Sequence, residues 1–107
     1  MTDNSMSDEE FDAHFRELVD RFIDQANSLT QNSHPENIGL ALLHAASRYN
    51  AFVVSTHAQS LEEYEKSMDQ AKAYFMSQYE TMLDENLVDY RNVYSGELKY
   101  AHLIKRQ

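Results

Sequence analysis

Three serine residues, each followed three positions later by a glutamate, place the strongest constraint on how this chain can fold. The pairs are Ser7 with Glu10, Ser33 with Glu36, and Ser60 with Glu63. In a capping box the serine hydroxyl accepts a hydrogen bond from the amide of the third helical residue, and the glutamate accepts one from the serine amide. The first amides of a helix have no partner inside the helix, so such a box marks a helix start. The pattern therefore predicts three helices, one after each serine.

The spacing of apolar residues indicates how far each helix extends. Steps of three and four predict a first helix from about Asp8 to Gln31 with one buried stripe. A second helix from Pro35 to about Ala58 has apolar residues over more than half of its circumference, which predicts a largely enclosed helix. A third, from Leu61 to about Tyr94, carries aromatic and apolar residues that approximate a heptad seam. Gly96 then provides a left-handed stop.

Short connections between consecutive helices favour antiparallel neighbours. The sequence therefore predicts an all-α fold: a three-helix antiparallel up-down-up bundle with a long third helix, a short C-terminal helical tail and no strands. With only two glycines and one proline, the chain has little room for loops. We expect a flexible N-terminus at residues 1–7, a single helical domain at 8–94 and a basic tail at 95–107.

The charge of the chain narrows the choice of partners. Eighteen Asp and Glu against nine Lys and Arg make a net charge of -9, which repels nucleic-acid phosphate, so we expect no nucleic-acid partner. The absence of cysteine excludes disulfides and thiolate metal sites and suits a reducing cytosol. The chain starts without the basic and apolar regions of a signal peptide, and no apolar run approaches the ~18 residues of a membrane span. A cytoplasmic protein without a membrane partner is expected.

Two longer motifs resemble a known family. The first is A-A-S-R-Y-N-A-F-V-V, ending at Val54, and the second is Y-F-x-x-Q-Y-x-x-M-L-x-E-N-L-x-D-Y, from Tyr74 to Tyr90. Together they resemble a family of short bacterial proteins known only as a domain of unknown function, over roughly residues 11 to 94. The resemblance implies an all-helical cytosolic protein and assigns it no activity.

Three polar or amphipathic residues, Arg48, Tyr49 and Asn50, lie within the least polar run of the chain. A guanidinium can hold a carboxylate through two hydrogen bonds, so these residues are candidates for a site that binds a small anion or carboxylate. The alternative is structural, and we favour it: Arg48 pairs with Asp20 or Asp69, and Asn50 fixes the helix register. A buried amide without a partner costs about 1–3 kcal/mol, so Asn50 is expected to be hydrogen-bonded.

Patterns for metal binding and catalysis are weak. Glu10, His14 and Glu17 share a helix face at a spacing that can chelate a metal, but exposed helices often produce this spacing by chance. The third helix carries four acidic residues that are expected to lie in solvent: Glu80, Asp84, Glu85 and Asp89. We predict no metal, no cofactor and no catalytic residues, which leaves an enzymatic role without support.

The length of the third helix points to an oligomer. At 1.5 Å per residue it is about 50 Å long, whereas the first two reach only about 35 Å, so its far end should project beyond them. That end is largely apolar, and a homodimer would bury it. The predicted interface comprises Met82, Leu83, Asn86, Leu87, Tyr90 and Tyr94. We therefore expect a structural or protein-interaction module that forms a homodimer; the alternative is a ligand- or metal-binding regulator, or a minor enzyme, that uses Arg48 and Asn50.

Overall fold

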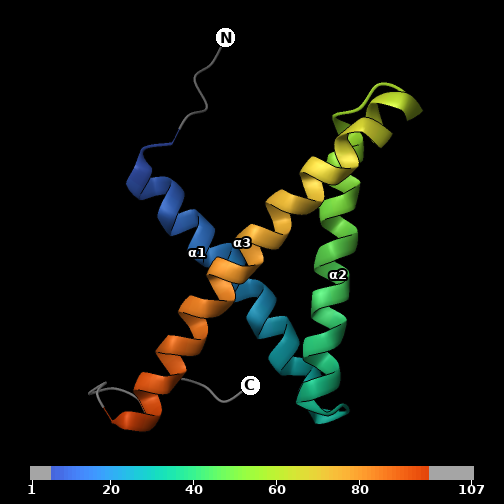
Figure 1. The fold of residues 1–107 in the computed structure, drawn as a ribbon. Helices are drawn as coiled ribbons and strands as arrows, with labels where there is room; N and C mark the ends of the chain where they lie inside the picture. The colour runs from blue at the N-terminus through green and yellow to red at the C-terminus, as the bar shows by residue number, and fades with distance from the viewer. Residues whose placement is uncertain (1–5, 97–107) are drawn as a thin grey trace. The chain divides into compact units, whose positions relative to one another are not determined.

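The protein is all-α. The structure is a computed structural model that describes residues 6–96, of which 89% are helical and none is in a strand (Figure 1). Its elements are α1 (Asp8–Ser28), a single 3-10 turn η1 (Leu29–Gln31), α2 (Pro35–Thr56) and α3 (Leu61–Ser95). The predicted all-helical class, the three helices and the long third helix are confirmed. The predicted helical tail after Gly96 lies outside the described residues.

Two of the three serine caps are formed. At α1 the Ser7 hydroxyl accepts from the Glu10 amide (3.1 Å), and the Ser7 amide donates to Glu10 Oε1 (2.9 Å), which completes a capping box. At α3 the Ser60 hydroxyl accepts from the Glu63 amide (3.1 Å), while Glu63 Oε1 accepts from the Gln59 amide (2.8 Å) instead of the cap amide. Both helices begin where the sequence predicted because these side chains satisfy amides that have no helical partner.

The predicted box at Ser33 is wrong, although the predicted start of α2 is right. The helix begins at Pro35, so His34 occupies the cap position, and its carbonyl accepts from the amides of Asn37 and Ile38 (3.0 and 3.1 Å). Proline is favoured at the first helical position because its missing amide would have no partner there. It therefore fixes the start one residue too late for Ser33 to act as the cap.

The end of α3 is set by Gly96. This glycine has φ 76°, in the left-handed region, and its amide donates to the carbonyls of Asn92 and Val93. A residue without a Cβ adopts this conformation at little cost, which is why glycine commonly terminates helices.

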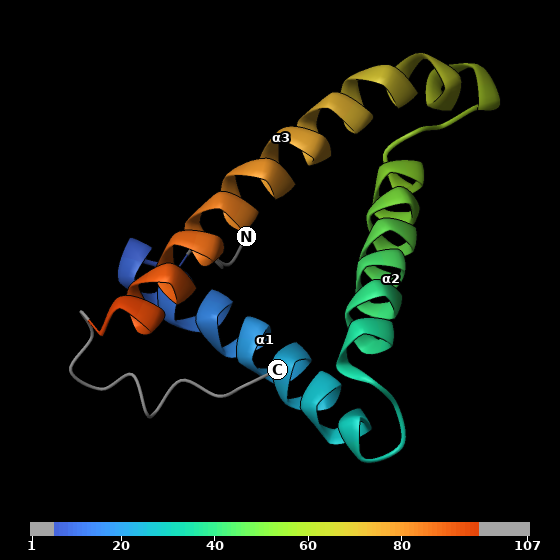
Figure 2. The same ribbon diagram turned by 60° about the horizontal axis from the view of Figure 1, so that its bottom comes forward.

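The helices form two units that divide within α2, between Ala46 and Ser47. The first unit contains α1, η1 and the first half of α2, and the second contains the rest of α2 and α3. Within each unit the two helices meet at the turn that joins them and separate away from it (Figures 1 and 2). Each unit is thus a helical hairpin that is closed only near its turn.

Burial follows this geometry. No described residue is fully buried, in α2 or elsewhere, so the expectation that α2 is largely enclosed is wrong. Near the first turn the partly buried residues are Ile23, Ala26, Asn27, Ile38 and Leu42. Near the second turn they are Val53, Val54, Ala58, Tyr64, Ser67, Ala71 and Phe75. Asn50 in α2 is partly buried as well, and so are Asn92 and Val93 at the C-terminal end of α3. A helix that is apolar around most of its circumference needs neighbours on several sides. Within each unit α2 has one neighbouring helix, and the two helices separate beyond their turn.

None of the three helices, over the residues described, has both the length and the apolar character that a membrane crossing requires.

Candidate functional site

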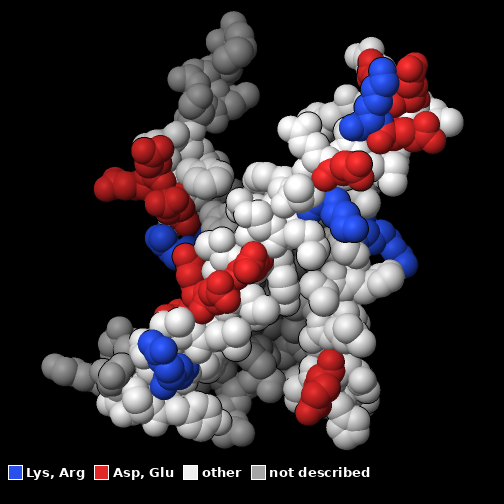
Figure 3. All heavy atoms as spheres, viewed as in Figure 1, with Lys and Arg blue, Asp and Glu red and all other residues white. Residues whose placement is uncertain are grey.

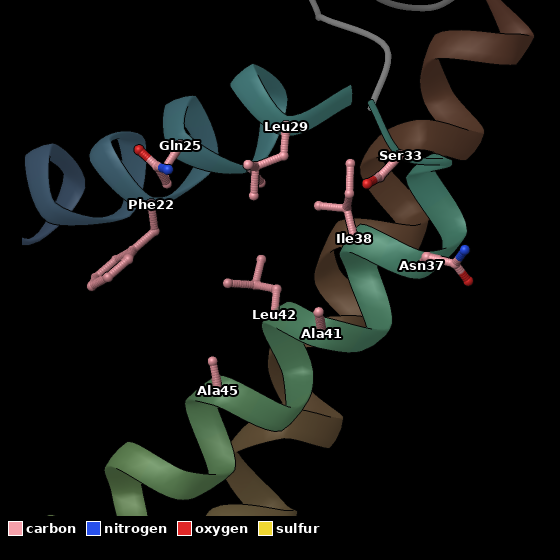
Figure 4. A pocket seen from close by; sticks show the side chains of 10 residues that line it. Phe22, Gln25, Leu29, Ser33, Asn37, Ile38, Ala41, Leu42 and Ala45 are labelled. Atoms are coloured by element: carbon pink, nitrogen blue, oxygen red, sulfur yellow. The ribbon is translucent and has the colours of Figure 1, made fainter. Parts of the chain in front are cut away.

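The first unit contains an open apolar groove between α1 and α2, close to their turn. Its volume is about 470 Å³, and it is lined by Phe22, Gln25, Ala26, Leu29, Ser33, Asn37, Ile38, Ala41, Leu42 and Ala45. In Figure 4 Phe22 and Leu29 extend from α1 towards Ile38 and Leu42 on α2, whereas the amide of Asn37 points away from the hollow. The lining has no charged side chain. Such a surface suits apolar side chains of a partner, and none of its lining residues has an ionisable side chain for acid–base chemistry.

Towards its N-terminus, α1 continues the apolar surface of the groove. Residues 6–22 are all exposed, including Phe11 and Phe15, whose rings stack on each other with centroids 6.2 Å apart. Phe22 keeps 65% of its surface exposed although it lines the groove. These side chains form an exposed apolar stripe along α1, a kind of surface that often marks a protein–protein contact.

The second unit carries another uncovered apolar surface, on the C-terminal half of α3. All residues from 76 to 91 are exposed, and Leu87 and Tyr94 have 60% and 90% of their surface in solvent. All six predicted interface residues, Met82, Leu83, Asn86, Leu87, Tyr90 and Tyr94, are therefore accessible. The Asn86 side chain donates from Nδ2 to the Met82 carbonyl (2.9 Å), so within this chain its amide is engaged by its own helix.

Arg48, Tyr49 and Asn50 do not line the groove. Arg48 is exposed, and Tyr49 is 65% exposed with its ring 5.8 Å from that of Phe52. Asn50 is partly buried, whereas the expected hydrogen bond was argued from a fully buried amide. The described residues contain no buried polar side-chain atom that lacks a hydrogen bond, so the large penalty of an unpaired buried amide does not arise. The pairing of Arg48 with Asp20 or Asp69 stays a prediction.

The weak metal pattern on α1 forms one loose contact. His14 Nδ1 lies 4.0 Å from Glu17 Oε1, and both side chains are at least half exposed. No group of three or more His, Asp or Glu residues in the described part of the chain is arranged to hold a metal ion. Glu80, Asp84, Glu85 and Asp89 are exposed, as expected for a solvated face.

Charged side chains leave wide areas of the surface uncharged. On the face drawn in Figure 3, acidic and basic residues form small separate groups, with broad uncharged areas between them. One ion pair joins Lys66 Nζ to Glu62 Oε2 (3.4 Å) one turn apart on α3, and the two side chains are 75% and 78% exposed. Exposed pairs of this kind contribute little to stability, so the apolar areas are the more informative part of the surface.

The groove was not predicted from the sequence, although its lining residues follow a helical spacing. On α1 the lining residues Phe22, Ala26 and Leu29 follow steps of four and three, and on α2 Ile38, Leu42 and Ala45 do the same. Periodicity shows that these residues share a face of each helix. It does not show that the two faces separate and leave a hollow between them.

Comparison with known proteins identifies a family. The model of a family described as "Protein of unknown function (DUF3144)" matches residues 15–91. No curated protein and no solved structure matches the chain.

Proposed function

Because the chain belongs to the DUF3144 family, whose description states no function, we propose a role from its surfaces: it is a protein-interaction module that forms a homodimer. The observation that carries this proposal is that neither unit, taken by itself, encloses a core. Over the described residues, 22 large apolar side chains are exposed and no residue is fully buried. A chain of this size needs most of its apolar surface covered to offset the conformational entropy lost on folding. A partner would supply the missing cover.

The length of α3 favours another chain as that partner. Helix α3 has 35 residues and α2 has 22. At about 1.5 Å per residue, the end of α3 extends about 20 Å past α2 when the two run antiparallel from their turn. The chain's own α2 cannot cover that end. A second copy is the simplest partner, because a two-fold contact buries the same surface on both chains.

Light scattering on the full chain tests the homodimer from low to high micromolar concentration. The expected mass is twice the 12.5 kDa of one chain at the upper end, falling towards 12.5 kDa on dilution. A mass near 12.5 kDa at every concentration would contradict the proposal.

The alternative role, a regulator or minor enzyme using Arg48, Tyr49 and Asn50, has less support. These residues lie outside the groove, and Arg48 and Tyr49 are exposed. Small-molecule sites are usually concave and bury most of the ligand.

A further inference from the structure

Resting on the proposed homodimer, we propose that Met82 is an oxidation site within it: conversion of the Met82 thioether to a sulfoxide by a peroxide separates the two copies. In this step hydrogen peroxide transfers one oxygen atom to the sulfur. The S–O bond forms as the O–O bond breaks, the sulfur loses two electrons, and the peroxide, reduced by those two electrons, leaves as water.

Methionine supplies all of the sulfur in this chain, which contains five methionines and no cysteine. Redox chemistry at sulfur is therefore restricted to the thioethers. The methionines in the described residues expose 46% to 65% of their surface, and they are Met6, Met68, Met76 and Met82. Because solvent reaches these side chains in a single chain, a small peroxide reaches them as well.

Met82 differs from the other methionines in its position. Met6 precedes α1, and Met68 lies in the half of α3 that includes the partly buried residues near the second turn. Met76 lies about 120° around α3 from Met82, at about 100° per residue. Met82 is thus the methionine on the face of α3 that is assigned to the homodimer contact.

That face of α3 continues on both sides of Met82. Tyr79 lies one turn before it, and Asn86 and Tyr90 follow at steps of four, the spacing that keeps residues on one face of a helix. All four side chains are exposed within the chain. A second copy that covers this face therefore covers the Met82 side chain as well.

Oxidation changes the property that suits methionine to such a contact. The unbranched thioether is flexible and apolar, so it fills irregular gaps between packed side chains. The sulfoxide is polar and chiral, and its oxygen needs a hydrogen-bond donor when it is buried. In a two-fold dimer both copies contribute the altered side chain, so the loss is counted twice. Enzymatic reduction of the sulfoxide restores the thioether, so the switch is reversible.

Peroxide treatment of the full-length protein tests the proposal. Mass spectrometry of peptides measures the oxidation of each methionine, and sedimentation velocity measures the dissociation constant of the dimer. We expect complete oxidation of Met82 to raise that constant by about tenfold or more. Treatment with methionine sulfoxide reductases should restore the original value, which separates the effect from irreversible damage.

Two variants assign the effect to one sulfur. Met82→Leu keeps an apolar side chain of similar size and cannot be oxidised, so its dimer should persist after peroxide treatment, within about twofold. Met6→Leu is the matched control, and its dimer should dissociate as the native one does. If Met82→Leu loses its helical circular dichroism, Met82→Ile replaces it.

The rate of oxidation provides a second measurement that needs no substitution. Raising the protein concentration from below to above the dissociation constant should slow the oxidation of Met82 by about fivefold or more, because the dimer covers this side chain. The oxidation rate of Met6 should stay constant over the same range.

The possible failures are distinguishable. If the untreated chain has a mass near 12.5 kDa at every concentration, the homodimer fails, and this proposal fails with it. If the untreated chain dimerises and full oxidation of Met82 leaves the dissociation constant unchanged, only the oxidation site is refuted. If the Met82→Leu dimer dissociates in peroxide as the native dimer does, another methionine is responsible and the assignment to Met82 is wrong.

Discussion

The two halves of α3 have similar side chains in different surroundings. In the first half Tyr64, Ala71 and Phe75 lie on one face, and each is partly buried. In the second half the same face carries Tyr79, Met82 and Tyr90, and no residue from 76 to 91 is even partly buried. Both halves are continuous helix between the Ser60 cap and Gly96.

The difference shows that periodicity and cover are separate properties. The heptad-like spacing continues through both halves, but α2 accompanies α3 only near the Thr56–Leu61 connection. An apolar face without a neighbour contributes nothing to folding until something covers it. In this chain the first half of α3 therefore contributes to the fold, and residues 76–91 are exposed and available for binding.

The largest expected effect comes from a charge in the uncovered half. Leu87→Asp should weaken the homodimer by about a hundredfold or more, because the substitution is present on both copies, burying each leucine contributes about 1.5–3 kcal/mol, and a buried aspartate adds a penalty. Sedimentation velocity over a concentration series measures the change. Leu40→Asp is the matched control, since Leu40 is as exposed as Leu87 but lies on the side of α2 away from the groove. Equal weakening by both variants would refute a specific role for this end of α3.

Truncating one aromatic residue in each half of α3 should change the free energy of unfolding by different amounts. Phe75→Ala removes a partly buried ring and should lower the free energy of unfolding by about 1–2 kcal/mol, below the roughly 3–5 kcal/mol typical of a fully buried Phe. Tyr79→Ala, one turn further on, should change it by less than about 0.5 kcal/mol at dilutions where the chain is monomeric. Urea titration at one low protein concentration compares them. A larger loss for Tyr79→Ala would mean that the second half is covered within the chain.

Substitutions of the serines at the helix starts allow a similar comparison of stability. Ser7→Ala and Ser60→Ala each remove a hydroxyl that caps a helix and should cost about 1 kcal/mol. Ser33→Ala should cost much less, because His34 and not Ser33 occupies the cap position of α2. Thermal unfolding followed by circular dichroism measures all three. An equal loss at Ser33 would show that a third capping box forms in solution.

The smallest effects are expected at the two glycines, with opposite signs. Gly96→Ala forces a Cβ into the left-handed region and should destabilise the end of α3 by about 1 kcal/mol. Gly39→Ala lies inside α2 with open space around the added Cβ and should stabilise by about 0.5–1 kcal/mol. Urea midpoints of the two variants check the signs. If Gly96→Ala stabilises the protein, then α3 does not end at this glycine in solution.

The starts of the helices and the end of α3 were well predicted because the residues that determine them act locally. Ser7, Pro35, Ser60 and Gly96 act on hydrogen bonds and backbone angles within a few positions, so their sequence context is sufficient. Ser33 shows the limit of the pattern: a proline two residues later moved the cap position. For the candidate site, the exposed end of α3 followed from helix length alone, whereas the groove between Phe22 and Leu42 did not.

By itself the sequence determined the class of fold, the three helices with their starts and ends, and the excess of negative charge, because each depends on neighbouring residues or on composition. The tertiary structure decided what covers each apolar face. The apolar residues of α2 predicted an enclosed helix, yet the helices of each hairpin separate beyond their turn and leave α2 exposed. Burial of a side chain depends on where distant segments of the chain, or another chain, lie relative to it. The period of an apolar pattern shows which residues share a face of a helix, but it does not show what packs on that face.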